Sequence, residues 1–589
     1  MIRDKVTGAE FVALFVEKYC FPNIFIVTGG ACAYIVDAIG ESKNLKYTCF
    51  QHEQSAAMAA DAVWRTINRI GVTVSTSGPG ATNLITGIAC SYFDSIPSLH
   101  ITGQVNESES KSNIAANVRQ AGFQETDIVS IVSPIVKWAH KVTDVEDLIT
   151  SLFEAVSVAL SGRKGPVLVD VPMNVQKELI DSEKVSEVLS RTIELNFVSP
   201  EKSTSSTVQN FLDGSSRPLA ILGAGSALSG TAKDIQKWCE DNSVPFVTTW
   251  SAFSYVNRNS ELYLGSLGVY GGRLANWAVQ ASDKIVVFGS RLDNRQRTSN
   301  PKGFAPFADI LVFDIDQEEL NKFNVQKNYQ KVLFDLRNIN MMLDFKRENE
   351  NSEWLNSLNS LKEKITGDFE DSVNPGELNP YGAVVKIQTK LKEKSILVAD
   401  CGANLCWVFQ SYPADSNFIF SAFGNSPMGY SLPAAIGAQI ANPGKEVYCF
   451  IGDGGLQMNI QELQTIDHYN LPIKIILLNN FGYGIIKQFQ DSYFNARHYA
   501  SGDGYSVPNF ERIAKAYNFE YLKIRTLSEI DSINLEGGKI IIELQLPPGA
   551  LITPKTEMNR FIHDQFPYTT KSLVDNLPFS YPSNPSNMI

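Results

Sequence analysis

Two oxygen-bearing side chains, Asp453 and Asn480, have the types and positions needed to bind a metal ion together. Asp453 lies in a glycine-rich turn directly after an apolar run, Val447–Ile451. Asn480 follows a second apolar run, Ile473–Leu478, from which only Asn479 separates it. A carboxylate and a carboxamide are hard oxygen ligands, suited to Mg²⁺ that is held jointly with a diphosphate.

The elements that would position these side chains are a strand, a glycine turn, a helix and a second strand. We expect the helix over Met458–His468 and the second strand over Ile473–Leu478. This order is typical of a phosphate-binding unit in an open parallel sheet, where the carboxyl ends of the strands meet. An ordinary α/β turn with a capping aspartate is the alternative for the turn taken alone.

Strands and helices alternate in the same way near the amino terminus. Apolar strands followed by glycine turns or helices are predicted at 25–30, 47–65 and 70–94, with further strands at 98–103 and 165–171. This alternation predicts a doubly wound parallel sheet. Because 589 residues exceed the size of one core, we expect three α/β domains of this kind. Their predicted bounds are 1–185, 195–345 and 375–550, followed by a tail at 551–589, with polar linkers at 181–192 and 346–354.

Composition excludes several classes of function. The formal net charge of −12 and a pI near 5.2, without any basic block, argue against a nucleic-acid or anionic-membrane partner. The amino terminus reads as an amphipathic helix after Thr7 without a signal-peptide core, and no apolar run is long enough to span a bilayer. Eight scattered cysteines without a CxxC pair favour reduced thiols in a cytoplasmic protein.

The Gly-Asp-Gly turn, helix, apolar strand and Asn-Asn pair resemble the diphosphate-and-metal motif of thiamine diphosphate enzymes. The surrounding GNSPMGYSLPAAIGA and GDGGLQMNIQELQT are similar to acetolactate synthases and their near relatives. The resemblance extends over nearly the whole chain, with the tail matching least. It implies a pyrimidine-binding domain, a central flavin-type domain and a diphosphate-binding domain, with thiamine diphosphate, Mg²⁺ and FAD as cofactors.

In the first domain the resemblance implies that Glu53, in His52-Glu53-Gln54, contacts the aminopyrimidine of the cofactor. A first-turn glutamate favoured by the helix dipole is the alternative. Gly29, Gly30 and the turn at 77–83 would line the active site from a neighbouring subunit. The residues expected to shape the substrate and flavin end of the cavity, or else to be surface polar residues with one core Phe, are Gln104, Phe123, Gln124 and Lys137.

The middle domain carries stretches at 264–298 and 308–316 that resemble the flavin-binding segments of acetolactate synthases. Other members of the wider family keep this domain without binding flavin. On the match, the residues in contact with FAD would be Gly223, Gly225, Arg291, Asp293, Arg295 and Asp314.

In the third domain the resemblance gives Asp453, Asn480 and the backbone carbonyl of Gly482 as metal ligands, and Met428 as the side chain that bends the cofactor. Asn404 stands where these enzymes commonly have His, and we expect it to donate a hydrogen bond to the diphosphate. The turn glycines expected around the cofactor are Gly402, Gly452, Gly454, Gly455 and Gly484.

Two departures concern the acceptor. The segment 105–122 is longer than in biosynthetic acetolactate synthases and is similar to relatives from surface-polysaccharide pathways, and Phe489 replaces the usual Trp. The resemblance implies decarboxylation of a 2-oxo acid, most simply pyruvate, with carboligation to an acceptor carbonyl. Transfer to a nucleotide-linked keto-sugar, simple decarboxylation and a non-catalytic regulatory role are the alternatives. A homodimer or homotetramer is expected, with active sites between subunits.

Overall fold

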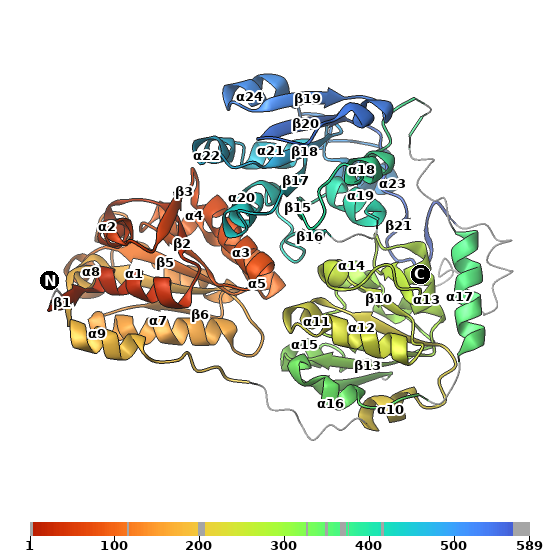
Figure 1. The fold of residues 1–589 in the computed structure, drawn as a ribbon, viewed down its shortest axis with the longest axis horizontal. Coiled ribbons are helices and arrows are strands. Elements are labelled where there is room, and N and C mark those ends of the chain that lie inside the picture. The colour runs from red at the N-terminus through yellow and green to blue at the C-terminus, as the bar shows by residue number, and fades with distance from the viewer. Residues whose placement is uncertain are drawn as a thin grey trace.

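The computed structural model describes residues 4–114, 117–197, 206–324, 328–347, 351–365, 373–374, 376–413 and 417–568. Within these residues the chain forms three lobes, each built on a six-stranded sheet with helices packed around it (Figure 1). All neighbouring strands within these three sheets run parallel, so the prediction of three doubly wound α/β domains is confirmed. No described helix is both long and apolar enough to cross a membrane.

The first sheet has the strand order β3-β2-β4-β5-β7-β6. Its strands alternate their side chains between two cores: Phe25 of β2 belongs to one, and Ile24 and Ile26 to the other. Both faces are therefore covered by helices, which is why these strands read as continuous apolar runs. The strand bounds are β2 Asn23–Val27, β3 Lys46–Cys49, β4 Gly71–Ser75, β5 Ser98–Gln104, β6 Trp138–Lys141 and β7 Val167–Pro172.

The other two sheets repeat this arrangement. The middle sheet has the order β11-β10-β9-β12-β13-β14 and the third β16-β15-β17-β18-β20-β19. The middle strands are β9 Pro218–Leu222, β10 Phe246–Thr248, β11 Tyr263–Ser266, β12 Lys284–Phe288, β13 Asp309–Asp314 and β14 Tyr329–Leu333. Those of the third sheet are β15 Ile396–Ala399, β16 Phe418–Phe420, β17 Val447–Gly452, β18 Lys474–Asn479, β19 Glu520–Ile524 and β20 Ile540–Gln545.

The first and third domains share a core. Helix α3 (Glu53–Ile67) of the first domain packs directly on helix α20 (Ser431–Ala441) of the third, as Figure 1 shows between the two lobes. A Cβ added to Gly437 would lie 2.2 Å from the carbonyl oxygen of Ala59, so only glycine allows this approach. Helix α3 is therefore packed without a gap against the third domain at this point.

The two segments predicted as polar linkers contain helices instead. Helix α9 (Ser182–Leu189) buries Val185 and Val188 against the first domain, and α17 (Ser352–Lys364) buries Trp354 and Leu358 in the middle domain. Both helices are amphipathic. Most of their residues are polar, which is why the segments were predicted as linkers, but a narrow apolar face is enough to pack each helix against its domain. Residues 348–350 of the second segment lie outside the described residues.

The described part of the tail is an ordered cap on the middle domain. Its strands β21 (Lys555–Thr556) and β22 (Gln565–Phe566) pair antiparallel, and Ile562 between them is buried in the core of the middle domain. The amide of Gln565 donates to the carbonyl oxygen of Gly271 at 2.9 Å. Residues 569–589 lie outside the described residues.

The helix predicted over 458–468 is two helices, α21 (Asp453–Met458) and α22 (Glu462–His468). Asn459 sits at the break with φ −129° and ψ 31°, outside helical values. Its side-chain amide donates to the carbonyl oxygen of Gly429 at 2.9 Å, a contact with a distant segment that the local pattern does not reveal. The helix therefore begins five residues earlier than predicted and is interrupted.

Candidate active site

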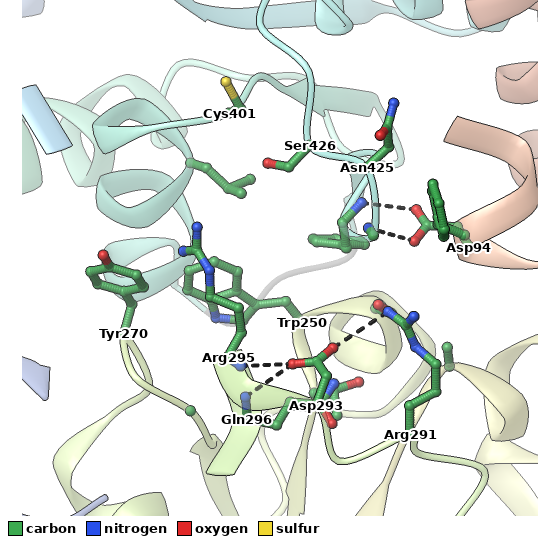
Figure 2. Close-up of a pocket in the computed structure, with 18 of the residues that line it drawn as sticks. Asp94, Trp250, Tyr270, Arg291, Asp293, Arg295, Gln296, Cys401, Asn425 and Ser426 are labelled. Atoms are coloured by element: carbon green, nitrogen blue, oxygen red, sulfur yellow. Dashed lines mark hydrogen bonds and ion pairs between the residues drawn. The ribbon is translucent and has the colours of Figure 1, made fainter. Parts of the chain in front are cut away.

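One cavity of about 770 Å³ lies between the middle and third domains. Figure 2 shows its middle-domain wall, with Arg291, Asp293 and Arg295, opposite Cys401 and Ser426 of the third domain. Asp94 of the first domain stands at its edge, where it accepts hydrogen bonds from the backbone N–H groups of Phe423 and Gly424 at 2.8 and 2.7 Å. The cavity therefore joins the predicted diphosphate end and the predicted flavin end in a single space.

At the third-domain end, the structure brings together the three predicted metal ligands. Asp453 begins α21 and Asn480 follows β18, and both line the cavity together with Gly482. The backbone N–H of Gly482 donates to Oδ2 of Asp453 at 3.0 Å, so the two strand ends are in direct contact. Burial raises the pKa of Asp453 from 3.8 to about 6, although backbone N–H groups that donate to it, first that of Gly454, oppose this shift.

Buried polar atoms without a partner show that this end of the cavity suits a polar ligand. Nδ2 of Asn480 and Oδ1 of Asn404 are buried and make no hydrogen bond within the described residues. Leaving such atoms unpaired is costly, so a ligand that pairs with them is strongly favoured. Among the described residues no cluster of three or more His, Cys, Asp or Glu side chains forms a metal site. A cation here would therefore be held by Asp453, by neutral oxygens and by an anionic ligand.

Asn404 does not present its amide as predicted. Its Nδ2 donates to the backbone carbonyl oxygens of Asp400 and Phe450, at 3.3 and 3.2 Å. The NH₂ group of Asn404 is thus engaged by these two backbone carbonyl oxygens. Only its side-chain carbonyl oxygen has no hydrogen-bond partner among the described residues. We expected the Asn404 amide to donate a hydrogen bond to a diphosphate, and the structure corrects this expectation.

Met428 lines the cavity on a loop that two buried carboxylates hold in place. At one end of the loop, Asp94 binds the N–H groups of Phe423 and Gly424; at the other, Asp400 accepts from the N–H of Gly429 at 2.9 Å. Burial raises the pKa of Asp400 to about 7, which backbone hydrogen bonds, first that of Cys401, counteract. Asp400 was missed from sequence, although its position directly after an apolar strand was a usable signal.

The turn glycines leave room around Met428. A Cβ on Gly454 would lie 2.7 Å from Cε of Met428 and 2.6 Å from the ring of Tyr483. A Cβ on Gly455 would lie only 2.0 Å from Oδ2 of Asp400. The three other predicted turn glycines, Gly402, Gly452 and Gly484, line the cavity with them.

At the middle-domain end, five of the six predicted flavin contacts line the same cavity. The exception is Gly223, which lies behind the wall, where a Cβ would meet the carbonyl oxygen of Gly289 at 2.3 Å. Asp293 caps the N–H of Arg295 at 2.8 Å and lies 3.4 Å from Nη2 of Arg291 (Figure 2). Burial raises the pKa of Asp314 to about 6. The five that line the cavity are Gly225, Arg291, Asp293, Arg295 and Asp314.

The predicted catalytic residues of the first domain form a separate group at the carboxyl edge of the first sheet. Glu53 begins α3, is 7% exposed and accepts from Nδ2 of Asn83 at 3.0 Å. A Cβ on Gly29 would touch Thr76 at 2.5 Å, and one on Gly78 would lie 2.8 Å from the carbonyl oxygen of Gln124.

None of the residues predicted at this edge lines the cavity that holds Asp453. The set comprises Gly29, Gly30, Glu53, Phe123 and Gln124. Phe123 is 85% exposed, which is far more than a core residue would be. Within one chain the predicted catalytic residues are therefore divided between two places.

Lys137 belongs to neither group, which corrects its prediction as a catalytic residue. It precedes β6, so it lies at the amino ends of the parallel strands, whereas Glu53 and Gln124 lie at the carboxyl ends. Its ammonium donates to the carbonyl oxygens of Val158 and Ser161, the latter at 2.7 Å. Burial and the charge of Lys164 lower its pKa to about 8. Lys137 thus closes the end of helix α7 (Val145–Leu160).

Comparison with known protein families identifies each lobe. Residues 6–131 match the model described as thiamine pyrophosphate enzyme, N-terminal TPP binding domain. Residues 206–338 match the central domain of the same enzymes, and residues 400–535 match their C-terminal TPP binding domain. Each segment falls within one of the three lobes: the first includes β2 to β5, the second all six strands of the middle sheet, and the third β16 to β19.

Comparison with individual proteins gives similarity over almost the whole chain. The chain is 32% identical over 564 residues to the acetolactate synthase large subunit of Lactococcus lactis, covering 94% of this chain and 95% of that protein. It is 34% identical to the acetolactate synthase large subunit of Parasynechococcus marenigrum, covering 88% and 83%. It is 31% identical to the acetolactate synthase isozyme 1 large subunit of Escherichia coli, covering 94% and 98%.

Proposed function

Because this chain belongs to the acetolactate synthase-like family of thiamine diphosphate enzymes, we infer that it decarboxylates a 2-oxo acid and transfers the two-carbon unit. The simplest donor is pyruvate, and the receiving group is the carbonyl of a second substrate. Thiamine diphosphate, when bound, supplies the electron sink that lets carbon dioxide leave and the two-carbon unit attack. The observation that carries this proposal is the meeting of Asp453, Asn480 and Gly482 at the wall of one cavity.

The residues of the third domain bind and orient the cofactor in this proposal. Asp453, the side-chain oxygen of Asn480 and the carbonyl of Gly482 would hold Mg²⁺, with the diphosphate supplying further oxygens. The unpaired Nδ2 of Asn480 and the buried carboxyl of Asp453, whose pKa burial raises, fit this role, since each gains a partner on binding. Met428, fixed by the Asp400-bound loop, would set the angle between the two cofactor rings.

Glu53 would hold a proton opposite the aminopyrimidine, but it would do so in the active site of a second copy. Asp453 lines the cavity and Glu53 does not, so one chain alone brings only one of the two groups to the cofactor. The exposed Phe123 at the same edge supports a covering partner, because a large apolar side chain 85% exposed is costly in water. We therefore propose a homodimer or homotetramer with active sites shared between chains.

FAD would occupy the middle-domain end of the cavity. Arg291 and Arg295 stand there as possible partners for a diphosphate, and the buried hydroxyl of Thr249 has no hydrogen-bond partner among the described residues. Flavin would play a structural part, since carboligation involves no net redox change. Absorbance of protein purified without added flavin, followed by release on denaturation, tests this; colourless protein that gains no flavin on incubation would reject it.

An acceptor screen tests the reaction itself. Purified protein with thiamine diphosphate, Mg²⁺ and pyruvate is expected to release carbon dioxide and to form a carbon–carbon bond with one of the offered acceptors. The acceptors are acetaldehyde, a second pyruvate and a nucleotide-linked 4-keto-sugar. An Asp453→Ala variant, which lacks the charged metal ligand, serves as the control. Absence of carbon dioxide release from every 2-oxo acid tried would contradict the proposal, and release without ligation would indicate a simple decarboxylase.

The keto-sugar acceptor has one structural observation in its favour. The segment 105–122 is closed at its base by the carboxylate of Glu125, which accepts from the N–H of Lys111 at 2.7 Å and from those of Ala121 and Gly122 at 3.2 Å. Burial raises the pKa of Glu125, but these hydrogen bonds and that of Ser110 outweigh burial and leave it lowered. These hydrogen bonds hold the loop in a defined conformation next to Phe123, where it is suited to contact a larger acceptor. Residues 115 and 116 of this segment lie outside the described residues.

A further inference from the structure

The junction that carries Glu53 is held by the third domain of the same chain. The carboxylate of Glu462, in α22, accepts from the backbone N–H of Gln51, with both oxygens at 3.3 Å. Glu462 is fully buried, and its carboxylate also accepts from Oγ1 of Thr465 at 2.7 Å and interacts with the hydroxyl of Ser55 and the backbone N–H of His52. A buried carboxylate from another domain therefore lies at the start of α3, where N–H groups of the helix have no partner within it.

A second side chain from the same region supports the junction beyond Glu53. Oδ1 of Asn459 accepts from the amide of Gln54 at 3.2 Å and from the hydroxyl of Ser55 at 3.3 Å. Glu53 is thus flanked on both sides by residues that the third domain binds. Neither Glu462 nor Asn459 lines the cavity, so neither side chain is placed to contact a cofactor there directly.

We propose that Glu462 is a positioning residue, which fixes the Gln51–Glu53 junction so that the carboxyl of Glu53 is correctly placed toward the cofactor. This inference rests on the proposed role of Glu53. The carboxylate anchors the backbone two residues before Glu53, and both of its oxygens are engaged, so the junction cannot turn without breaking these bonds. A displacement of Glu53 by about 1 Å is enough to cost roughly 100-fold in rate.

The test compares Glu462→Gln with Thr465→Val. The first replaces one of the two oxygens that accept from the N–H of Gln51 by an amide nitrogen that cannot accept, while the second removes only the hydroxyl that donates to Oε2 of Glu462. In cofactor-free protein, hydrogen–deuterium exchange at residues 51–55 is expected to accelerate by about tenfold or more in Glu462→Gln and to stay as in the parent in Thr465→Val. In protein with thiamine diphosphate and Mg²⁺, exchange of the cofactor's C2 proton is expected to slow roughly 10- to 100-fold in Glu462→Gln only.

Cofactor affinity separates positioning from a general loss of structure. The dissociation constant for thiamine diphosphate is expected to stay within about twofold of the parent, because Asp453 and Asn480 are untouched. Unchanged exchange at residues 51–55, or equal slowing of C2 exchange in both variants, would overturn the inference. If Glu462→Gln does not fold, Glu462→Asp, which keeps the charge but shortens its reach, carries the same two measurements. Failure of the parent protein to exchange the C2 proton would instead count against the proposed function, while the amide measurement still decides whether Glu462 holds the junction.

Discussion

Asp453 is a carboxylate placed where ionisation is unfavourable until a cation arrives. Its pKa is raised to about 6, and those of Asp314 and Asp400 in the same cavity are raised to about 6 and 7, in each case first by burial. Between their ordinary value of 3.8 and these values, the folded chain binds more protons than the unfolded chain. These three groups therefore lower the free energy of unfolding as pH rises through that window. A cation bound at Asp453 stabilises the ionised carboxylate and so reverses the contribution of Asp453.

Magnesium-dependent binding of thiamine diphosphate should consequently weaken as pH falls. Below about pH 6 the metal competes with a proton on Asp453, so affinity is expected to drop by up to about tenfold per pH unit. Calorimetric titration between about pH 5 and 7.5 measures this. Asp314→Asn, which removes a different buried acid with a similar pKa, should keep the slope. A flat affinity across the range would show that Asp453 is not a ligand.

Substitution of Glu53 isolates its chemistry from its packing. Glu53→Gln keeps the shape and an oxygen that Asn83 can reach, but it removes the ionisable carboxyl. Exchange of the C2 proton of bound thiamine diphosphate is expected to slow by roughly 100- to 10,000-fold, the usual range for loss of a general acid or base. Proton NMR of quenched samples measures the rate. Glu10→Gln, in the first turn of α1 (Gly8–Tyr19), makes the same chemical change without effect on exchange; an unaltered rate in Glu53→Gln would remove this residue from the mechanism.

Residue types and spacing pointed to Asp453 and Asn480, and the family resemblance pointed to the other members of the third-domain site, but neither gave their orientation. The Asp453 and Asn480 motif is local, because each residue follows its own apolar strand, and the sheet brings strand ends together. The use of the Asn404 amide depends on carbonyl oxygens of two strands, and the place of Lys137 depends on which end of β6 it precedes. Both are set by tertiary contacts that the residue type does not encode.

At the scale of elements, α21 packs so closely on Asp400 that its glycines cannot be replaced. In Gly455→Ala the new methyl would lie 2.0 Å from Oδ2 of Asp400, which also holds the Met428 loop. We expect a loss of about 1–3 kcal/mol in the free energy of unfolding, together with weaker cofactor binding. Urea unfolding and cofactor titration measure the two effects. Gly444→Ala, where an added Cβ meets nothing within 4 Å, is the matched control, and equal stability of the two variants would contradict the tight packing.

The strands were predictable and the helix ends less so, for a physical reason. Parallel strands buried on both faces give continuous apolar runs, so β4, β5 and β7 could be predicted directly, whereas the half-buried β6 was not predicted. The break at Asn459 depends on the carbonyl of Gly429, which lies far away in the sequence. In α9 and α17 the signal was present, as Val185 with Val188 and Trp354 with Leu358 stand three and four positions apart. This helical spacing was overlooked because the remaining positions of both segments are mostly polar.

At the scale of the whole molecule, the separation of Glu53 from the Asp453 cavity predicts complementation. Oligomers assembled from Glu53→Gln and Asp453→Ala chains should recover activity that neither parent has, because one of the two shared sites then receives both intact groups. Co-refolding or co-expression with two affinity tags isolates the mixed species. Mixtures of Glu53→Gln chains alone, handled identically, show the background. Mixed oligomers no more active than either parent would place both groups in one chain.

The short helix α21 also has a consequence for inheritance. In the proposed dimer its first residue, Asp453, would belong to one active site, and Asn459 and Glu462, which follow its last residue, would hold Glu53 for the other. In a dimer, a displacement of this helix in one chain damages both sites at once. When equal amounts of normal and altered chains assemble at random, only dimers of two normal chains work, and activity falls to about a quarter and not to a half. An allele that shifts α21 would thus behave as a dominant one.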